Sequence, residues 1–72
     1  MELLELKEKT TLSREDAAAR LHRIADELAS GNDIVMESGN MRFMSRVPDE
    51  VRLKVEFEVE DGETEFEVEL TW

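Results

Sequence analysis

Carboxylate side chains are the residues of this sequence with the most obvious chemical potential. Glu stands at every second position on both sides of Asp61-Gly62, at 56, 58 and 60 and again at 63, 65, 67 and 69. Carboxylate oxygens bind hard divalent cations, and paired carboxylates serve as acid and base in glycoside hydrolysis. Both chemistries need enclosure, which the flat face of a strand does not provide. We therefore interpret these rows as a solvated face, with weak cation association as the alternative.

The other side chains capable of chemistry are isolated from one another. His22 is the only histidine, the chain has no Cys, and a catalytic or metal-binding His needs such partners. Helical spacing sets His22 beside Ala18 and Ala25, at the border of an apolar face. Trp72 could stack on a ligand, but its position in the alternating pattern favours a core or rim role. No phosphate loop or nucleophile motif is present. We expect a non-enzymatic protein without catalytic residues, cofactors or metal ligands.

The charge balance indicates which partners the chain can have. It has 72 residues, with 19 Asp and Glu against 9 Lys and Arg, and a net charge of -10. This length predicts one domain, residues 1–72. An acidic surface repels phosphate backbones and disfavours nucleic-acid binding, and it also suits a protein that works in high salt. No apolar run reaches membrane-spanning length and no signal peptide is evident, so we expect a cytoplasmic protein without a membrane partner.

The stretch from Val51 to Trp72 organises the predicted fold. Apolar residues alternate with charged ones on both sides of Asp61-Gly62, which is typical of two half-buried strands joined by a type I′ turn. A two-residue loop sets the register, which pairs Phe57 with Phe66 on the apolar face and Val51 with Trp72 at its end. A shift by one residue would expose every apolar side chain, so the register is strongly specified.

The rest of the chain predicts one helix and three further strands. Ser13 is a good N-cap, Glu15 and Asp16 follow in the first turn, and Gly31 suits the position after the helix. The strands are expected at Glu2–Thr10, Asp33–Glu37 and Met41–Val47. A two-residue loop at Gly39-Asn40 pairs Met36 with Phe43 and Val35 with Met44. Pro48-Asp49-Glu50 is expected as a short turn into the long hairpin.

Together these elements predict an α+β fold with the order β-α-β-β-β-β. One amphipathic helix would cover the apolar face of a five-stranded, mainly antiparallel sheet. The strand order 2-3-4-5-1 makes all neighbours antiparallel and places Lys7 and Lys9 beside the Glu row of the last strand. A parallel pairing of the first and second strands is the alternative.

The assembled motifs resemble those of the amphi-Trp domain family. The similarity lies in the segments 4–8 (Leu-Glu-Leu-Lys-Glu), 13–18, 31–33 and 47–51, and in the acidic alternating run that closes at Leu70-Thr71-Trp72. The resemblance covers nearly the whole chain. It implies a small bacterial or archaeal domain, and it implies no catalytic or ligand-binding residue, because the family carries no assigned activity.

We expect an interaction module that uses its outer sheet face or its open edge strand. Its partner would be another protein or a second copy of the chain. The alternative is a small ligand-binding or enzymatic domain with a site between helix and sheet. The expected interaction surface combines two outward apolar residues with neighbouring charges, namely Val35, Met44, Arg42, Arg46, Glu56, Glu58, Glu65 and Glu67.

Overall fold

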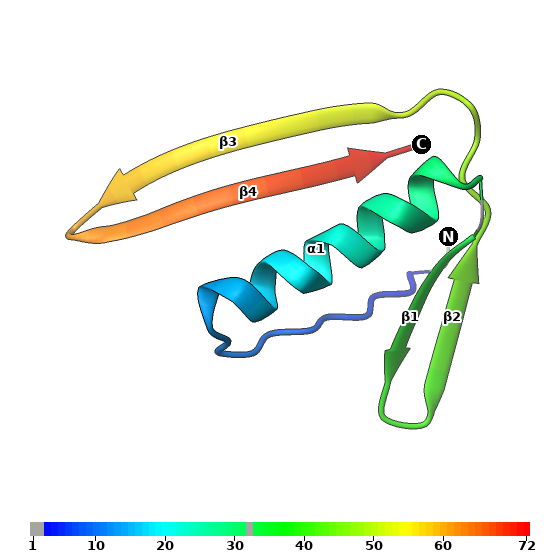
Figure 1. The fold of residues 1–72 in the computed structure, drawn as a ribbon, viewed down its shortest axis with the longest axis horizontal. Helices are drawn as coiled ribbons and strands as arrows, with labels where there is room; N and C mark the ends of the chain where they lie inside the picture. Colours follow the sequence, from blue (N-terminus) through cyan, green and yellow to red (C-terminus); the bar gives the residue numbers. More distant parts are fainter. Residues whose placement is uncertain (1–2, 32) are drawn as a thin grey trace.

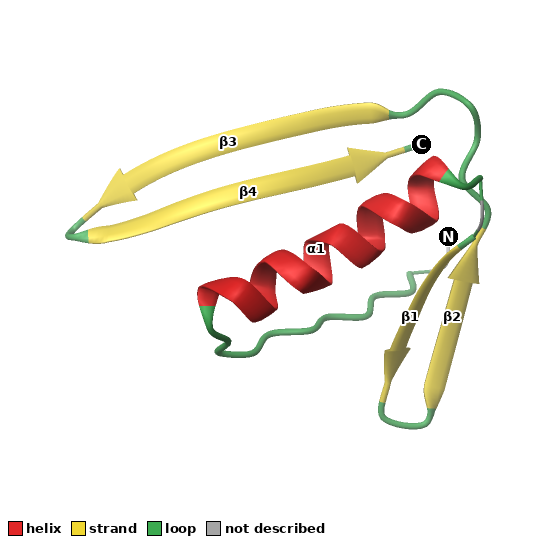
Figure 2. Ribbon diagram, in the orientation of Figure 1, coloured by secondary structure: helices red, strands yellow, loops and turns green. Residues whose placement is uncertain are grey.

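A computed structural model describes residues 3–31 and 33–72 of the chain. One helix, α1 (Arg14–Ala29), is followed by four strands, β1 (Ile34–Ser38), β2 (Met41–Ser45), β3 (Arg52–Glu60) and β4 (Glu63–Thr71). The strands form two hairpins that extend in different directions from the region around the end of α1 (Figures 1 and 2). The fold is α+β, as the sequence predicts.

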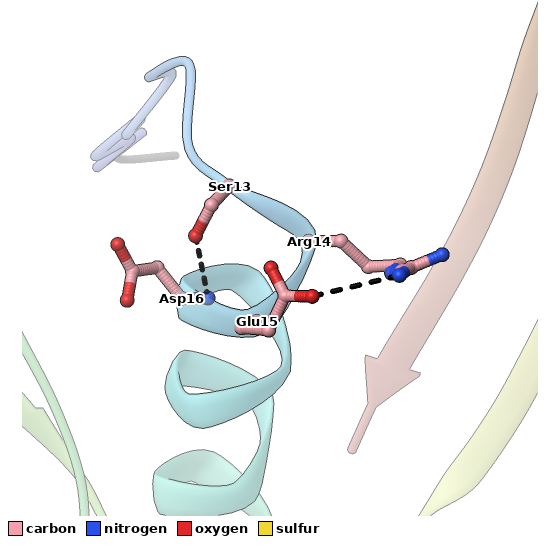
Figure 3. A network of polar contacts seen from close by, with 4 residues as sticks. All are labelled: Ser13, Arg14, Glu15 and Asp16. Atoms are coloured by element: carbon pink, nitrogen blue, oxygen red, sulfur yellow. Dashed lines mark hydrogen bonds and ion pairs between the residues drawn. The ribbon is translucent and has the colours of Figure 1, made fainter.

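Helix α1 begins and ends at the predicted signals. The Ser13 hydroxyl oxygen accepts a hydrogen bond of 3.0 Å from the backbone N–H of Asp16, as Figure 3 shows. This bond satisfies one of the N–H groups that the first turn leaves without a helical partner. At the other end Gly31 has a φ of 75°, a left-handed conformation that glycine adopts without steric cost. Both predicted helix boundaries are confirmed.

The long hairpin has the predicted register. Strands β3 and β4 pair Phe57 with Phe66 and Val55 with Val68, and the ladder runs from Arg52–Thr71 to Glu60–Glu63. The turn residues Asp61 and Gly62 have φ values of 49° and 79°, which is the positive φ at both positions that a type I′ turn requires. The expected outermost pair, Val51 with Trp72, lies beyond the ends of these strands.

The short hairpin also follows its sequence pattern. Strands β1 and β2 pair Met36 with Phe43 and Val35 with Met44 across a two-residue loop at Gly39-Asn40. Strand β2 ends at Ser45, two residues before the predicted end at Val47.

The predicted five-stranded sheet is wrong. The structure contains two separate two-stranded antiparallel sheets, β1-β2 and β3-β4, so the order 2-3-4-5-1 does not occur. Residues 46–51 connect β2 to β3, which is longer than the expected three-residue turn. Pro48 lies within this connection and has no N–H to donate and a restricted φ, so this segment does not extend either strand. The two hairpins therefore do not share one outer face.

The predicted first strand is also wrong. Residues 3–13 have no regular secondary structure and run along α1 (Figure 1), where Glu8 contacts Arg20 at 3.5 Å. Leu3 and Leu4 stay exposed and do not pair with β4. Lys7 and Lys9 consequently do not offset the Glu row of the long hairpin. Glu2, the first residue of the predicted strand, lies outside the described residues.

The described residues form no enclosed core. None of them is buried, and the best-covered apolar side chains, half-buried, are those of Leu6, Ala17, Ile24, Leu28, Ile34, Val35, Met36, Val47 and Leu70. Helix α1 lies against β1 and does not contact β3 or β4, so the prediction that it covers the long hairpin is wrong. Within residues 3–31 and 33–72, no helix has the length and apolar character that crossing a membrane requires.

Candidate interaction surface

The long hairpin presents one wholly uncharged face. We call it the hairpin apolar face, and it comprises Leu53, Val55, Phe57, Val59, Thr64, Phe66, Val68 and Leu70. Side chains of a strand alternate between its two sides, and the register brings each of these residues opposite another member of the set. Thr64 is its only polar member.

Two phenylalanines occupy the middle of the hairpin apolar face. The rings of Phe57 and Phe66 meet edge to face, with centroids 6.4 Å apart and an interplanar angle of 71°. This geometry is a favourable aromatic pair. Even so, Phe57 is 66% exposed and Phe66 is 65% exposed, because no other element of the described chain covers them.

Helix α1 carries a second uncovered apolar region. Leu21 is 59% exposed, and the alanines at 18 and 25 beside it are exposed as well. Ile24 and Leu28 of the helix are half-buried. Figure 1 shows that the helix runs below the long hairpin as a separate element. Two apolar regions of the molecule therefore lack the cover that a compact domain provides.

The opposite side of the long hairpin is rich in carboxylates. Glu56 lies opposite Glu67 and Glu58 opposite Glu65, as the sequence predicts. Arg52 and Lys54 are the basic residues on this side of β3, and Lys54 Nζ lies 3.4 Å from a Glu56 carboxylate oxygen. This interaction raises the pKa of Lys54 above its ordinary 10.5. A cation from the hairpin itself thus offsets part of the repulsion, rather than the N-terminal segment.

Crowding of carboxylates also changes the titration of Glu67. Its pKa is raised above the ordinary 4.5, first by a hydrogen bond with Glu65, then by desolvation and by the charge of Glu56. Protonation of Glu67 is favoured because it supplies a donor to one neighbour and removes repulsion with another.

The short hairpin carries the basic part of the predicted surface. Val35 and Met44 are a cross-strand pair, and Arg42 Nε contacts a Glu37 carboxylate oxygen at 3.5 Å. Val35, Met44 and Arg46 line an open depression of about 420 Å³ together with Gly31 and Asp33. An apolar pair beside a guanidinium group can bind the apolar and acidic parts of another protein.

A second open depression lies beside the C-terminal tryptophan. It measures about 310 Å³ and is lined by Leu4, Leu6, Ile34, Met36, Phe43, Ser45 and Trp72. Trp72 is 48% exposed, which agrees with the rim role and not with a fully enclosed one. The lining is almost entirely apolar, so this depression has no group that could act as acid, base or nucleophile on a substrate, apart from the Ser45 hydroxyl.

Acidic residues and the histidine do not form a reactive cluster in the part of the chain that the structure describes. No group of three or more His, Asp or Glu side chains there is placed to hold a metal ion. The carboxylates around the hairpin tip, among them Glu60 and Glu63, surround a shallow open depression. His22 is exposed on α1.

A family model described as the Amphi-Trp domain matches residues 1–72. The chain belongs to the Amphi-Trp domain family. The resemblance seen in the sequence motifs is thereby confirmed over the whole length. Comparison with curated proteins and with solved structures gives no significant match.

The Amphi-Trp domain distributes the predicted interaction residues over two hairpins. Val35, Arg42 and Met44 lie on the β1-β2 hairpin and Arg46 directly follows it, whereas the four glutamates lie on β3-β4. Because β2 and β3 are not neighbours, these residues do not form one continuous face.

Sequence reasoning missed the hairpin apolar face of the Amphi-Trp domain as an exposed surface. The alternating pattern identified these side chains but assigned them to the core. One signal pointed the other way. The apolar face of α1 is composed largely of alanine, with Leu21, Ile24 and Leu28 as its only large side chains. Such a helix offers little apolar area to cover two strands of nine residues each.

Proposed function

We propose that this Amphi-Trp domain is a non-enzymatic protein-interaction module. The observation that carries the proposal is the exposure of the hairpin apolar face, with both Phe57 and Phe66 about two-thirds accessible to water. Large contiguous apolar surfaces on soluble domains are typical of sites where another molecule binds. The partner would cover this face.

The energetics of a two-stranded hairpin support this proposal. An isolated hairpin is at best marginally stable in water and needs packing against another element. In this chain β3 and β4 contact each other but neither α1 nor the β1-β2 hairpin. A partner that packs on the hairpin apolar face would stabilise the strands on which the face is built.

The charged and open-edged parts of the molecule would select and orient the partner. The carboxylates Glu56, Glu58, Glu65 and Glu67 lie on the reverse side of the same strands and disfavour contact with an acidic partner there, so they direct such a partner to the hairpin apolar face. Val35 and Met44, with Arg42 and Arg46 nearby, offer a second, smaller contact. Each strand of a two-stranded sheet also has one unpaired edge, which can accept an added strand. The net charge of -10 disfavours nucleic acid, and the cytoplasmic location stays a prediction.

A photo-crosslinking experiment tests the proposal. A photoreactive phenylalanine analogue replaces Phe57 in the centre of the hairpin apolar face, and in a control protein it replaces Glu58, the next residue, whose side chain points the opposite way. Both proteins are expressed in cells that produce the domain naturally and are irradiated there.

We expect a discrete crosslinked protein from position 57 and much less from position 58. Mass spectrometry identifies the captured chain, which is either a different protein or another copy of this domain. An absence of crosslinks from position 57, in a protein that circular dichroism shows to be folded, would refute the proposal.

The depression beside Trp72 favours a second candidate function, the binding of a small apolar ligand. Its volume of about 310 Å³ and its apolar lining suit such a molecule. Trp72 is the only tryptophan, so the fluorescence of the chain comes from a side chain that lines this depression. Energy transfer to the dye anilinonaphthalene sulfonate should be lost in Phe43→Ser and retained in Phe57→Ala. Equal loss in both variants would refute this candidate.

A further inference from the structure

We propose that the partner of the hairpin apolar face is a second copy of this chain, so that the domain is a homodimer. The inference rests on the proposed function, because it names the occupant of the same surface. Three observations support it: the accessible area of the single chain, its dimensions, and the charge distribution around the face.

The single chain exposes far more surface than a compact domain of its mass. Its accessible surface is 6940 Å² for 8.3 kDa, whereas a compact monomer of this mass exposes about 4,600 Å². The excess is about 2,300 Å² per chain, and a standard stable interface buries about 800 Å² per partner. The open surface is therefore large enough for a permanent interface.

The dimensions lead to the same conclusion. The radius of gyration is 14.1 Å, and a compact domain of 72 residues has a value of about 11 Å. Two chains packed into one compact body would have about 14 to 15 Å. A single copy is therefore more extended than a compact domain of its length, and a second copy could pack into the space that it leaves open.

The charge distribution permits contact between identical faces. Each chain has a net charge of -10, so two copies repel each other unless the carboxylates point away from the contact. The hairpin apolar face has no charged member, and the Glu row lies on the reverse side of the same strands. A two-fold axis can bring this face against its equivalent without an unpaired charge. A second copy of the chain is also present wherever the first one is made. This suits a fold that has no enclosed core of its own and needs a partner to cover its apolar face.

The interface must include more than the two hairpins. A ribbon of two nine-residue strands measures about 30 Å by 10 Å, and its flat area is only about 300 Å². This is well below the excess area of the chain. The exposed side of α1 around Leu21 is another apolar region, and we place it at the edge of the same interface.

Two cysteine variants test the proposal, because the natural chain contains no Cys. Val55→Cys places a thiol on the hairpin apolar face, and Glu56→Cys places one on the reverse face of the same strand. Maleimide labelling rates are measured on the reduced proteins, and sedimentation velocity of the unlabelled chain measures its mass. Val68→Cys and Glu69→Cys form a second pair on β4 should the first pair not fold.

We expect a particle of twice the 8.3 kDa chain mass, with the thiol at position 55 labelled at least tenfold more slowly than that at position 56. A monomer with fast labelling at both positions would refute the homodimer and leave the interaction module intact. A monomer with slow labelling at position 55 would refute both, since the chain would then cover its own face. A dimer with fast labelling at both positions would place the contact elsewhere and refute the inference.

Discussion

Replacement of Phe57 by Ala distinguishes a covered hairpin apolar face from a permanently exposed one. In the single chain the Phe57 ring is 66% exposed and meets Phe66 edge to face, so its removal takes away little burial within the monomer. In the proposed dimer the same ring lies at the centre of the surface that each copy contributes to the interface. The substitution should therefore weaken association far more than it weakens the hairpin.

The expected magnitude follows from the exposed fraction. Full burial of a Phe side chain is worth about 1.5 to 3 kcal/mol, so covering the exposed two-thirds of Phe57 is worth about 1 to 2 kcal/mol per copy. Two copies contribute about 2 to 4 kcal/mol, which corresponds to an increase of about 30-fold to 1,000-fold in the dimer Kd.

Sedimentation equilibrium over a dilution series measures this Kd. Glu58→Ala is the matched control, because it truncates the adjacent side chain on the reverse face of β3. That control should leave Kd unchanged or lower it, since it removes a negative charge. A change of less than threefold for Phe57→Ala, in a protein that associates, would show that the hairpin apolar face is not the contact and would refute the reasoning.

Three further predictions concern the fold. Ser13→Ala removes the 3.0 Å cap to Asp16 and should cost about 1 kcal/mol in urea denaturation, while Ser13→Asp retains the acceptor and most of the stability. The raised pKa of Glu67 means that the fold binds this proton more tightly than the unfolded chain, so stability falls as pH rises from 4.5 through the raised pKa. Glu67→Gln should accordingly have a higher urea midpoint than the natural chain at pH 7, and that advantage should disappear below pH 4.5; a lower midpoint at pH 7 would contradict the assignment. Added NaCl should raise the urea midpoint and strengthen self-association, because it screens the net charge of -10, and weakening by salt would contradict this.

Local structure could be predicted from the sequence because its signals are local. The period-two alternation and the Asp61-Gly62 turn determine the register of the long hairpin, since only one register places all apolar side chains on one side. Ser13 and Gly31 mark the ends of α1 because each satisfies a backbone requirement within one helical turn. These requirements depend little on the rest of the molecule.

The arrangement of the elements could not be predicted in this way. The alternation in β3 and β4 shows that one face needs apolar cover, but it does not identify what provides the cover. We assigned this role to α1 and joined the strands into one sheet, whereas the structure separates the hairpins at the connection containing Pro48. The predicted surface was consequently divided, with Val35 and Met44 on one hairpin and the four glutamates on the other.

The sequence by itself determined the two hairpins, the helix and its caps, the acidic reverse face and the family. Each depends on periodicity or on contacts between residues that are close along the chain. Only the tertiary structure decided that the hairpin apolar face stays open, because cover depends on whether distant elements meet. In this chain α1 contacts β1 and leaves β3 and β4 exposed, which is the observation from which we propose that a second copy completes the apolar packing.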